Sequence, residues 1–298
     1  MSMKKYRQYV LPAAIVLGLL LHKVCATLAF LVPYLIFTIL FLTFSAVDLR
    51  KLRLTKLDVL LLVWQTAMAA GCYLLITHMG GDKVVAEGVM MASLCPVAAS
   101  STVVACMLGA DRRTMTGYSI FGNIGIAAIA PLFFTFIGDH PEHSLAASYL
   151  LMLGKISSTL VLPFVAALVL QVLLPKVNDG VARYTGWSYY VWAVALLLTL
   201  GQTIHFIFDH GEGHWDTIAW LGGLSFVFCI GQFLVGRLLH PAFGDRVSGG
   251  QLMGQKNSAM GIWMCSMFLT PLSSVFMAFY SVFQNLFNAY QISRMKRQ

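Results

Sequence analysis

The chain has 298 residues, of which 58% are hydrophobic and 11% are charged, and its mean hydropathy is +0.77. A soluble domain carries about a quarter charged residues, so this composition excludes a soluble globular protein and indicates a polytopic membrane protein. Long apolar runs also exclude a β-barrel, whose strands alternate apolar and polar residues. The net charge of +8 raises the question of a nucleic-acid partner, which the placement of the charges answers.

Apolar runs separated by charged residues or by Gly and Pro predict an all-α fold with ten transmembrane helices. The first run is short and follows a basic start, as in a signal peptide, but its apolar pattern continues into the second run, which favours a retained helix. In chain order the predicted helices cover residues 9–21, 26–47, 57–78, 84–109, 113–138, 145–174, 186–208, 217–239, 247–269 and 271–292.

The positions of the basic residues support this count. When the N-terminus is placed in the cytoplasm, nearly all Lys and Arg residues fall in cytoplasmic segments, and only Lys23 and Lys83 fall in outer loops. Cytoplasmic loops of membrane proteins carry such an excess, so both termini are expected on the cytoplasmic side of the cell (inner) membrane. Topology therefore explains the positive charge. The protein is therefore expected to lie in a lipid bilayer and to bind no nucleic acid. It is expected to be a monomer or a weak homodimer.

Two lysines, Lys155 and Lys256, lie inside predicted spans, whereas all twelve acidic residues lie in loops or at span ends. An ionisable group within the hydrocarbon is costly and is a candidate for function. Lys155 lies about three turns from a span end, where its long stem can snorkel or bond a backbone carbonyl, which favours a structural role. Lys256 lies mid-span among polar residues, which favours a functional role.

Five predicted spans precede residue 140 and five follow it. An odd number of spans per half turns the second half upside down relative to the first, as in inverted-repeat transporters. Residues 1–139 and 140–298 are therefore expected to form two inverted five-helix repeats.

The fourth and ninth spans each contain helix breakers followed by a small polar cluster. The fourth, SLCPVAASSTVVACMLGAD, contains Pro96, and the ninth, SGGQLMGQKNSAMGIWMC, contains Gly249, Gly250 and Gly254. A break within the hydrocarbon frees backbone groups that lipid cannot satisfy, so it persists where it lines a polar site. Two breaks in corresponding spans predict a midplane binding site. The alternative is that each break is merely tolerated, as Pro and Gly often are in membrane helices.

At these residues the chain resembles the bile acid:sodium symporter family, within the wider bile/arsenite/riboflavin transporter-type superfamily. CPVAASSTVVACMLGAD and GQKNSAMG resemble that family's crossovers in the fourth and ninth helices. Gln65, in LLVWQTAM, matches a family glutamine on the third helix, and Gln284 and Asn285, in VFQNLFNAY, match a polar pair on the tenth. The resemblance implies a panel of helices 1, 2, 6 and 7 and a core of helices 3–5 and 8–10, in which helices 4 and 9 are unwound and cross.

The resemblance also implies alternating-access transport of an organic anion, usually with sodium. The first sodium site would use Ser101, Thr102 and Ser119. A second sodium site would use Gln65 and groups around 253–255. Substrate is expected near Asn257 and Asn285. The predicted substrate and transport residues are Lys256, Asn257, Gln255, Ser258, Asn285 and Gln284.

The chain departs from the family at the sodium sites. The ninth-helix glutamate that both sites share falls at Leu252, a fifth-helix serine falls at Met115, and the glutamine before Asn257 is Lys256. An ammonium about 3–5 Å from a sodium ion repels it by several kcal/mol, even at an effective dielectric near 20. We therefore expect the Lys256 ammonium to occupy the place of a sodium ion.

Transport would then be sodium-independent, or coupled to protons if Lys256 loses its proton during the cycle. The alternative is that Lys256 is a fixed counter-charge for carbonyls at the end of a half-helix. Both leave a positive site, which favours a small anionic solute.

The sequence contains few motifs of other functional classes. HExxH, paired membrane aspartates and GxSxG are absent, so an enzyme is not expected; Ser100, Ser101 or Ser258 with Lys256 is a weak candidate for a Ser–Lys dyad. Beyond Na⁺ or H⁺ as a coupling ion, neither a cofactor nor a metal site is expected. A channel or a non-transporting membrane sensor with the same fold remains the alternative function.

Overall fold

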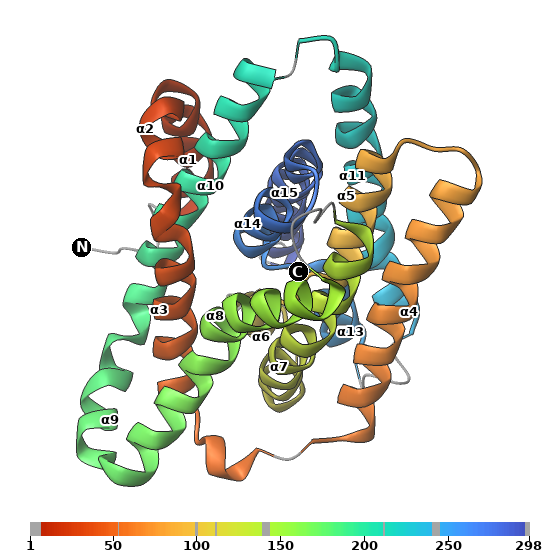
Figure 1. The fold of residues 1–298 in the computed structure, drawn as a ribbon. Helices are drawn as coiled ribbons and strands as arrows, with labels where there is room; N and C mark the ends of the chain where they lie inside the picture. The colour runs from red at the N-terminus through yellow and green to blue at the C-terminus, as the bar shows by residue number, and fades with distance from the viewer. Residues whose placement is uncertain are drawn as a thin grey trace.

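The computed structural model describes residues 7–52, 54–98, 101–110, 112–138, 144–210, 212–239 and 245–295. Within these ranges the chain is helical apart from turns, loops and one isolated β-bridge (Figure 1). Six helices in the described residues are long and apolar enough, by length and composition, to cross a membrane. The prediction of a helical membrane protein is confirmed at this level.

The first part of the chain begins with two short helices that are separated only by a turn at Leu21. The 3-10 turn η2 (Ala29–Leu31) then joins the second helix to the third, so that His22–Ser45 forms one apolar segment. The second predicted span thus begins four residues earlier than expected. The helices of this part are α1 (Arg7–Leu20), α2 (His22–Leu28), α3 (Val32–Ser45), α4 (Lys56–His78), α5 (Lys83–Leu94), α6 (Ser101–Met107) and α7 (Arg112–Ile137).

The second part contains one helix that the sequence did not predict, α9, which starts at Pro175 immediately after α8. Proline suits the first position of a helix because its missing N–H would have no partner there. The 3-10 turn η4 (Arg183–Trp187) leads from α9 into α10, and η5 (Pro271–Ser273) precedes the last helix. The helices are α8 (Leu145–Leu173), α9 (Pro175–Ala182), α10 (Ser188–His210), α11 (Trp215–Leu238), α13 (Arg246–Gly254), α14 (Ser258–Phe268) and α15 (Ser274–Met295).

The helices pack as two groups with α14 and α15 between them (Figure 1). On one side α10 packs against α1, α2 and α3, and α3 also packs against α8. On the other side α4 packs against α5, and α11 packs against α13. Helix α14 contacts α3 and α10 as well as α5, and α15 contacts α5, α10 and α11. Helices α14 and α15 therefore lie in the middle of the molecule.

Glycines allow α11 and α13 to approach closely. A Cβ at Gly236 would overlap the Gly249 carbonyl, and a Cβ at Gly254 would overlap the ring of Phe233. Small residues commonly serve this purpose between membrane helices, because they let backbones come close enough for extensive van der Waals contact. The close fit holds α13, and with it the break that follows Gly254, against the long helix α11.

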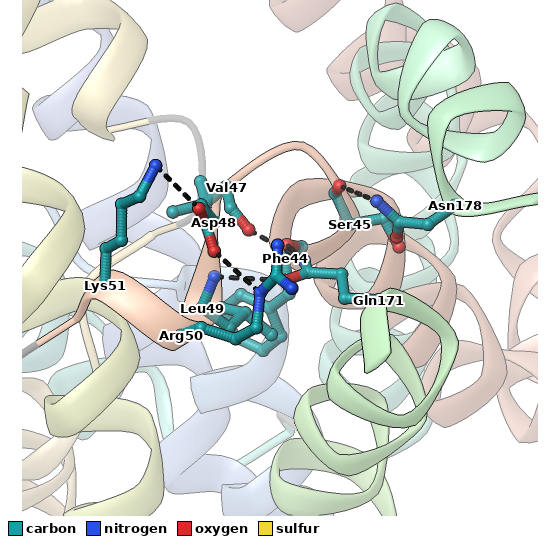
Figure 2. A network of polar contacts seen from close by, with 9 residues as sticks. All are labelled: Phe44, Ser45, Val47, Asp48, Leu49, Arg50, Lys51, Gln171 and Asn178. Atoms are coloured by element: carbon teal, nitrogen blue, oxygen red, sulfur yellow. Dashed lines mark hydrogen bonds and ion pairs between the residues drawn. The ribbon is translucent and has the colours of Figure 1, made fainter. Parts of the chain in front are cut away.

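The end of α3 is held by side-chain amides from α8 and α9 (Figure 2). Gln171 Nε2 donates to the carbonyl oxygens of Phe44 and Val47 at 3.1 and 2.7 Å, and its Oε1 accepts from the Leu49 N–H at 3.1 Å. Asn178 donates to one more carbonyl of the same turn. The last carbonyls of a helix lack intrahelical partners, so these amides replace water as caps.

The loop after α3 carries two exposed ion pairs around Asp48 (Figure 2). Lys51 Nζ lies 3.0 Å and Arg50 Nε 3.3 Å from the carboxylate. The hydrogen bond from Lys51, aided by Arg50, lowers the pKa of Asp48. Because solvent screens exposed pairs, these contacts add little to stability, whereas the basic residues themselves mark this end of the bundle.

Candidate functional site

The two interrupted segments meet through their backbones. Helix α5 ends at Leu94 and α13 ends at Gly254, and the extended residues that follow pair as an isolated antiparallel bridge between Val97 and Lys256. The Ala98 N–H donates to the Gln255 carbonyl at 3.2 Å, and the Asn257 N–H donates to the Pro96 carbonyl at 2.8 Å. The interruptions predicted at Pro96 and near Gly254 are therefore present, and each satisfies backbone groups of the other.

Helix α15 supplies further partners for the second break. Gln284 Oε1 accepts from the Lys256 N–H at 2.9 Å, and its Nε2 donates to the Lys256 carbonyl at 3.0 Å. The Tyr280 hydroxyl donates to the Gly254 carbonyl at 2.8 Å. Predicted as a transport residue, Gln284 is buried and acts here as a clamp on the extended backbone.

Side chains from other helices cap the end of α5. Gln65 on α4 donates through Nε2 to the last two carbonyls, those of Leu94 at 2.8 Å and Cys95 at 2.7 Å. Its Oε1 accepts from the Tyr118 hydroxyl of α7 at 2.6 Å. The predicted ion ligand Gln65 therefore directs its oxygen to Tyr118 and its nitrogen to the helix end.

Lys256 forms a hydrogen bond with the carbonyl that precedes these two along α5. Its side chain is 2% exposed, and its Nζ donates to the Ser93 carbonyl at 3.1 Å. Gln232 on α11 donates to the Ala92 carbonyl at 3.3 Å. The C-terminal end of a helix carries about half a negative charge, which stabilises an ammonium. The Lys256 nitrogen thus contacts one carbonyl oxygen at this helix end, and carbonyl oxygens are a ligand type that a hard metal cation uses.

The Lys256 side chain reaches the end of α5, where its Nζ contacts the Ser93 carbonyl. A small cavity of about 10 Å³ lies beside it, room for about one water molecule. Residues of α4, α5, α7, α11 and α13 line this cavity together with Lys256. The ammonium is therefore enclosed by one of the two helix groups and does not face the boundary between them.

Asn257 differs from Lys256 in being partly exposed. From Ser248 to Cys265 it is the one residue that is not buried. Its Oδ1 accepts from the Met260 N–H at 3.4 Å and caps α14, which packs against α3 and α10. The accessible part of the break is thus a polar amide at the positive end of a helix.

The other predicted transport residues divide by exposure. Asn285 is partly exposed, and its Nδ2 donates to the Ser281 carbonyl at 2.7 Å. Gln255 and Ser258 are buried, and the Ser258 hydroxyl lies 2.9 Å from the Ser281 hydroxyl. Because Lys256 Nζ instead bonds the Ser93 carbonyl, the side chains of Ser258 and Lys256 do not share a hydrogen bond in the described structure, although the Ser258 N–H donates to the Lys256 carbonyl at 2.9 Å.

An apolar cluster occupies the position where the resemblance implies a carboxylate and a serine of the first sodium site. Met115 and Leu252 are 0% and 1% exposed and pack together with Val97 and Tyr118. Methyl and thioether groups offer a sodium ion none of the hard oxygen ligands it prefers. The substitutions seen in the sequence are thus packed into the interior.

The three hydroxyl residues predicted for that site are not joined by hydrogen bonds in the described structure. Ser101 is fully buried, and its Oγ has no partner among the described residues. Ser119 is buried, with its carbonyl contacted by the Asn123 amide, while Thr102 is partly exposed. Ser100 lies outside the described residues.

Sequence reasoning missed three members of this site: Gln232, Tyr118 and Tyr280. Each places one polar group in an apolar helix. An isolated glutamine in an apolar span, such as Gln232, is a signal for an interhelical hydrogen bond. The tyrosines carry no comparable signal, because tyrosine is also common in belts at the membrane surface.

No known protein-family model matches the chain, and no curated protein matches it significantly. The resemblance to the bile acid:sodium symporter family accordingly rests on the motifs and the order of the helices.

Proposed function

We propose that the chain is a ten-span secondary transporter that moves a small organic anion by alternating access, with an ammonium in place of a coupling sodium ion. The observation that carries the proposal is the contact of Lys256 Nζ with the Ser93 carbonyl, 3.1 Å apart, where two broken segments cross. Broken segments persist at membrane depth only where protein or a cavity satisfies them, and they are typical of transport sites.

The anion is proposed to bind at Asn257, with Asn285 beside the same boundary. Asn257 is accessible and caps the N-terminus of α14, where the helix dipole favours a negative group. The positive charge of Lys256, one residue away, adds to the favourable electrostatic potential of the helix N-terminus. In this proposal Lys256 acts on the substrate electrostatically, and Asn257 makes the contact.

Coupling is proposed to be independent of sodium. Lys256 already provides a positive charge at the α5 carbonyls, and Met115 and Leu252 fill the position of a first sodium site with apolar groups. Coupling to protons follows if Lys256 loses its proton during the cycle, and a fixed counter-charge follows if it does not. A pH gradient would drive uptake in the first case alone.

The moving parts are proposed to be two sets of helices, with α14 and α15 belonging to the second. Helices α1 to α3, α8 and α10 would form the panel, and the remaining spans the core, from two inverted repeats of residues 1–139 and 140–298. The contacts of α14 with α3 and α10 lie at the boundary that would open and close. The protein is proposed to work in the inner membrane as a monomer or a weak homodimer.

A thermal-shift screen of purified protein against carboxylates and sulfonates, followed by counterflow of the best ligand in liposomes, tests this function. We expect at least one anion to raise the melting temperature and to exchange across the bilayer. Asn257→Ala should weaken its binding by about tenfold, the loss of one good polar contact at about 1.4 kcal/mol. Currents through single open pores without counterflow would instead support the channel alternative.

A further inference from the structure

A second cavity is lined by residues other than those beside Lys256. Its volume is about 220 Å³, large enough for a small metabolite. It is formed where three connections approach one another: the residues before α5, those before α11 and those before α15. Phe206 of α10, Val84 of α5 and Leu272 of η5 give it apolar walls.

The polar lining of this cavity is suited to a cation. Asp82, His214, Thr217 and Thr270 contribute one carboxylate, one imidazole and two hydroxyls. Asp82 Oδ1 accepts from the Val84 N–H at 2.7 Å and so caps α5. Its Oδ2 has a long hydrogen bond of 3.4 Å from the Thr217 hydroxyl, and a carboxylate oxygen can accept more than one donor.

Asp82, which is exposed, is the one acidic residue among the described residues that line the cavity. Lys83, the next residue, approaches Glu87 at 3.9 Å, and Glu87 also accepts the Thr270 N–H at 3.0 Å. No lysine or arginine is among the described residues that line the cavity, so the Asp82 carboxylate disfavours an anion there. One carboxylate and one imidazole are fewer ligands than a divalent metal ion normally requires.

We infer that this cavity binds a small organic ammonium compound, with its nitrogen at Asp82 and its carbon body against Phe206, Val84 and Leu272. An ammonium can donate to the carboxylate and to the Thr217 and Thr270 hydroxyls. The aromatic ring of Phe206 attracts a cation that approaches its face. This site does not depend on the proposed transport of an anion, which concerns Asn257 on α14.

Calorimetric titration of the full-length purified protein with propylammonium chloride tests the inference, with propan-1-ol as a neutral probe of similar size. The wild type is expected to bind propylammonium and not propanol. Asp82→Asn should weaken binding at least tenfold, and because asparagine is also a good helix N-cap, α5 should stay intact. Asp216→Asn, which removes an exposed acid on the first turn of α11, is the matched control and should bind as the wild type does.

A second variant keeps the test decisive if Asp82→Asn folds poorly. Leu272→Trp should fill the cavity and abolish binding while leaving Asp82 in place. Equal affinity of the wild type and Asp82→Asn, equal affinity for propanol, or no binding of propylammonium at all would overturn the inference. None of these results bears on anion transport, since the titration requires no transport substrate.

Discussion

At the scale of single residues, the chain caps helix ends inside the protein with side chains of other helices. Gln171 does so for α3 and Gln65 for α5, each with a neutral amide. Lys256 performs the same task at Ser93 with a charge. A neutral amide would satisfy that carbonyl equally well, so hydrogen bonding alone does not account for the ammonium. Its distinguishing contribution is the positive charge.

Replacing Lys256 by methionine is expected to destabilise the protein by about 1–3 kcal/mol, because the Ser93 carbonyl loses its donor in a water-poor interior. Release of the buried charge from its desolvation cost offsets part of this loss. Lys155→Met is the control: Lys155 is exposed and its Nζ lies 4.0 Å from the Met267 sulfur, so its change should stay within about 0.5 kcal/mol. Unfolding in mixed micelles measures both; a Lys256→Met protein as stable as the wild type would contradict the capping role.

At the scale of secondary-structure elements, the breaks depend on close helix packing. The bridge between Val97 and Lys256 needs α13 to end at a fixed place, and α13 is positioned by glycine contacts with α11. Two glycines of α11 differ in this respect. A Cβ at Gly236 would meet the backbone of Gly249, whereas a Cβ at Gly231 would meet nothing within 4 Å.

Gly236→Ala is therefore expected to destabilise the protein by about 1–3 kcal/mol, the usual cost of overpacking. Gly231→Ala should be neutral or stabilising by up to about 1 kcal/mol, since alanine is the better helix former. Comparison of the two melting temperatures measures the difference. If the two variants melt together, the α11–α13 approach is looser than described.

The sequence allowed the breaks to be predicted but not their partners. Pro96 and Gly254 mark the interruptions because each residue type weakens a helix by itself. The contacts of Lys256 with Ser93 and of Gln284 with the backbone join positions 163 and 28 residues apart, which no local pattern specifies. That Lys256 is buried and Asn257 is partly exposed likewise depends on how the helices pack around the break.

Local sequence patterns also did not predict helix α9 or the packing of Met115 and Leu252. Pro175 is a good first residue for a helix, but the apolar pattern that locates spans does not detect so short an element. Leu252 and Met115 were recognised as departures from the family. Their packing in one cluster with Val97 and Tyr118 became evident only in three dimensions.

At the scale of the whole molecule, the proposed topology has ten spans with both termini in the cytoplasm. Alkaline phosphatase fused after Gly80 or after Glu212 is therefore expected to be active in the periplasm of a bacterial host, since both positions follow odd-numbered spans. A fusion after Asp179 should be inactive, and a green fluorescent protein at the C-terminus should fluoresce. The reverse activities would contradict the proposed topology.

The transport proposal depends on the Lys256 ammonium taking the place of a sodium ion where the two broken segments meet. The most direct measurement is the melting temperature of the purified protein, titrated with sodium chloride against potassium chloride at constant ionic strength. We predict identical curves for the wild type, and stabilisation specific to sodium in Lys256→Gln, where an amide oxygen replaces the ammonium. Stabilisation of the wild type by sodium and not by potassium would contradict the claim.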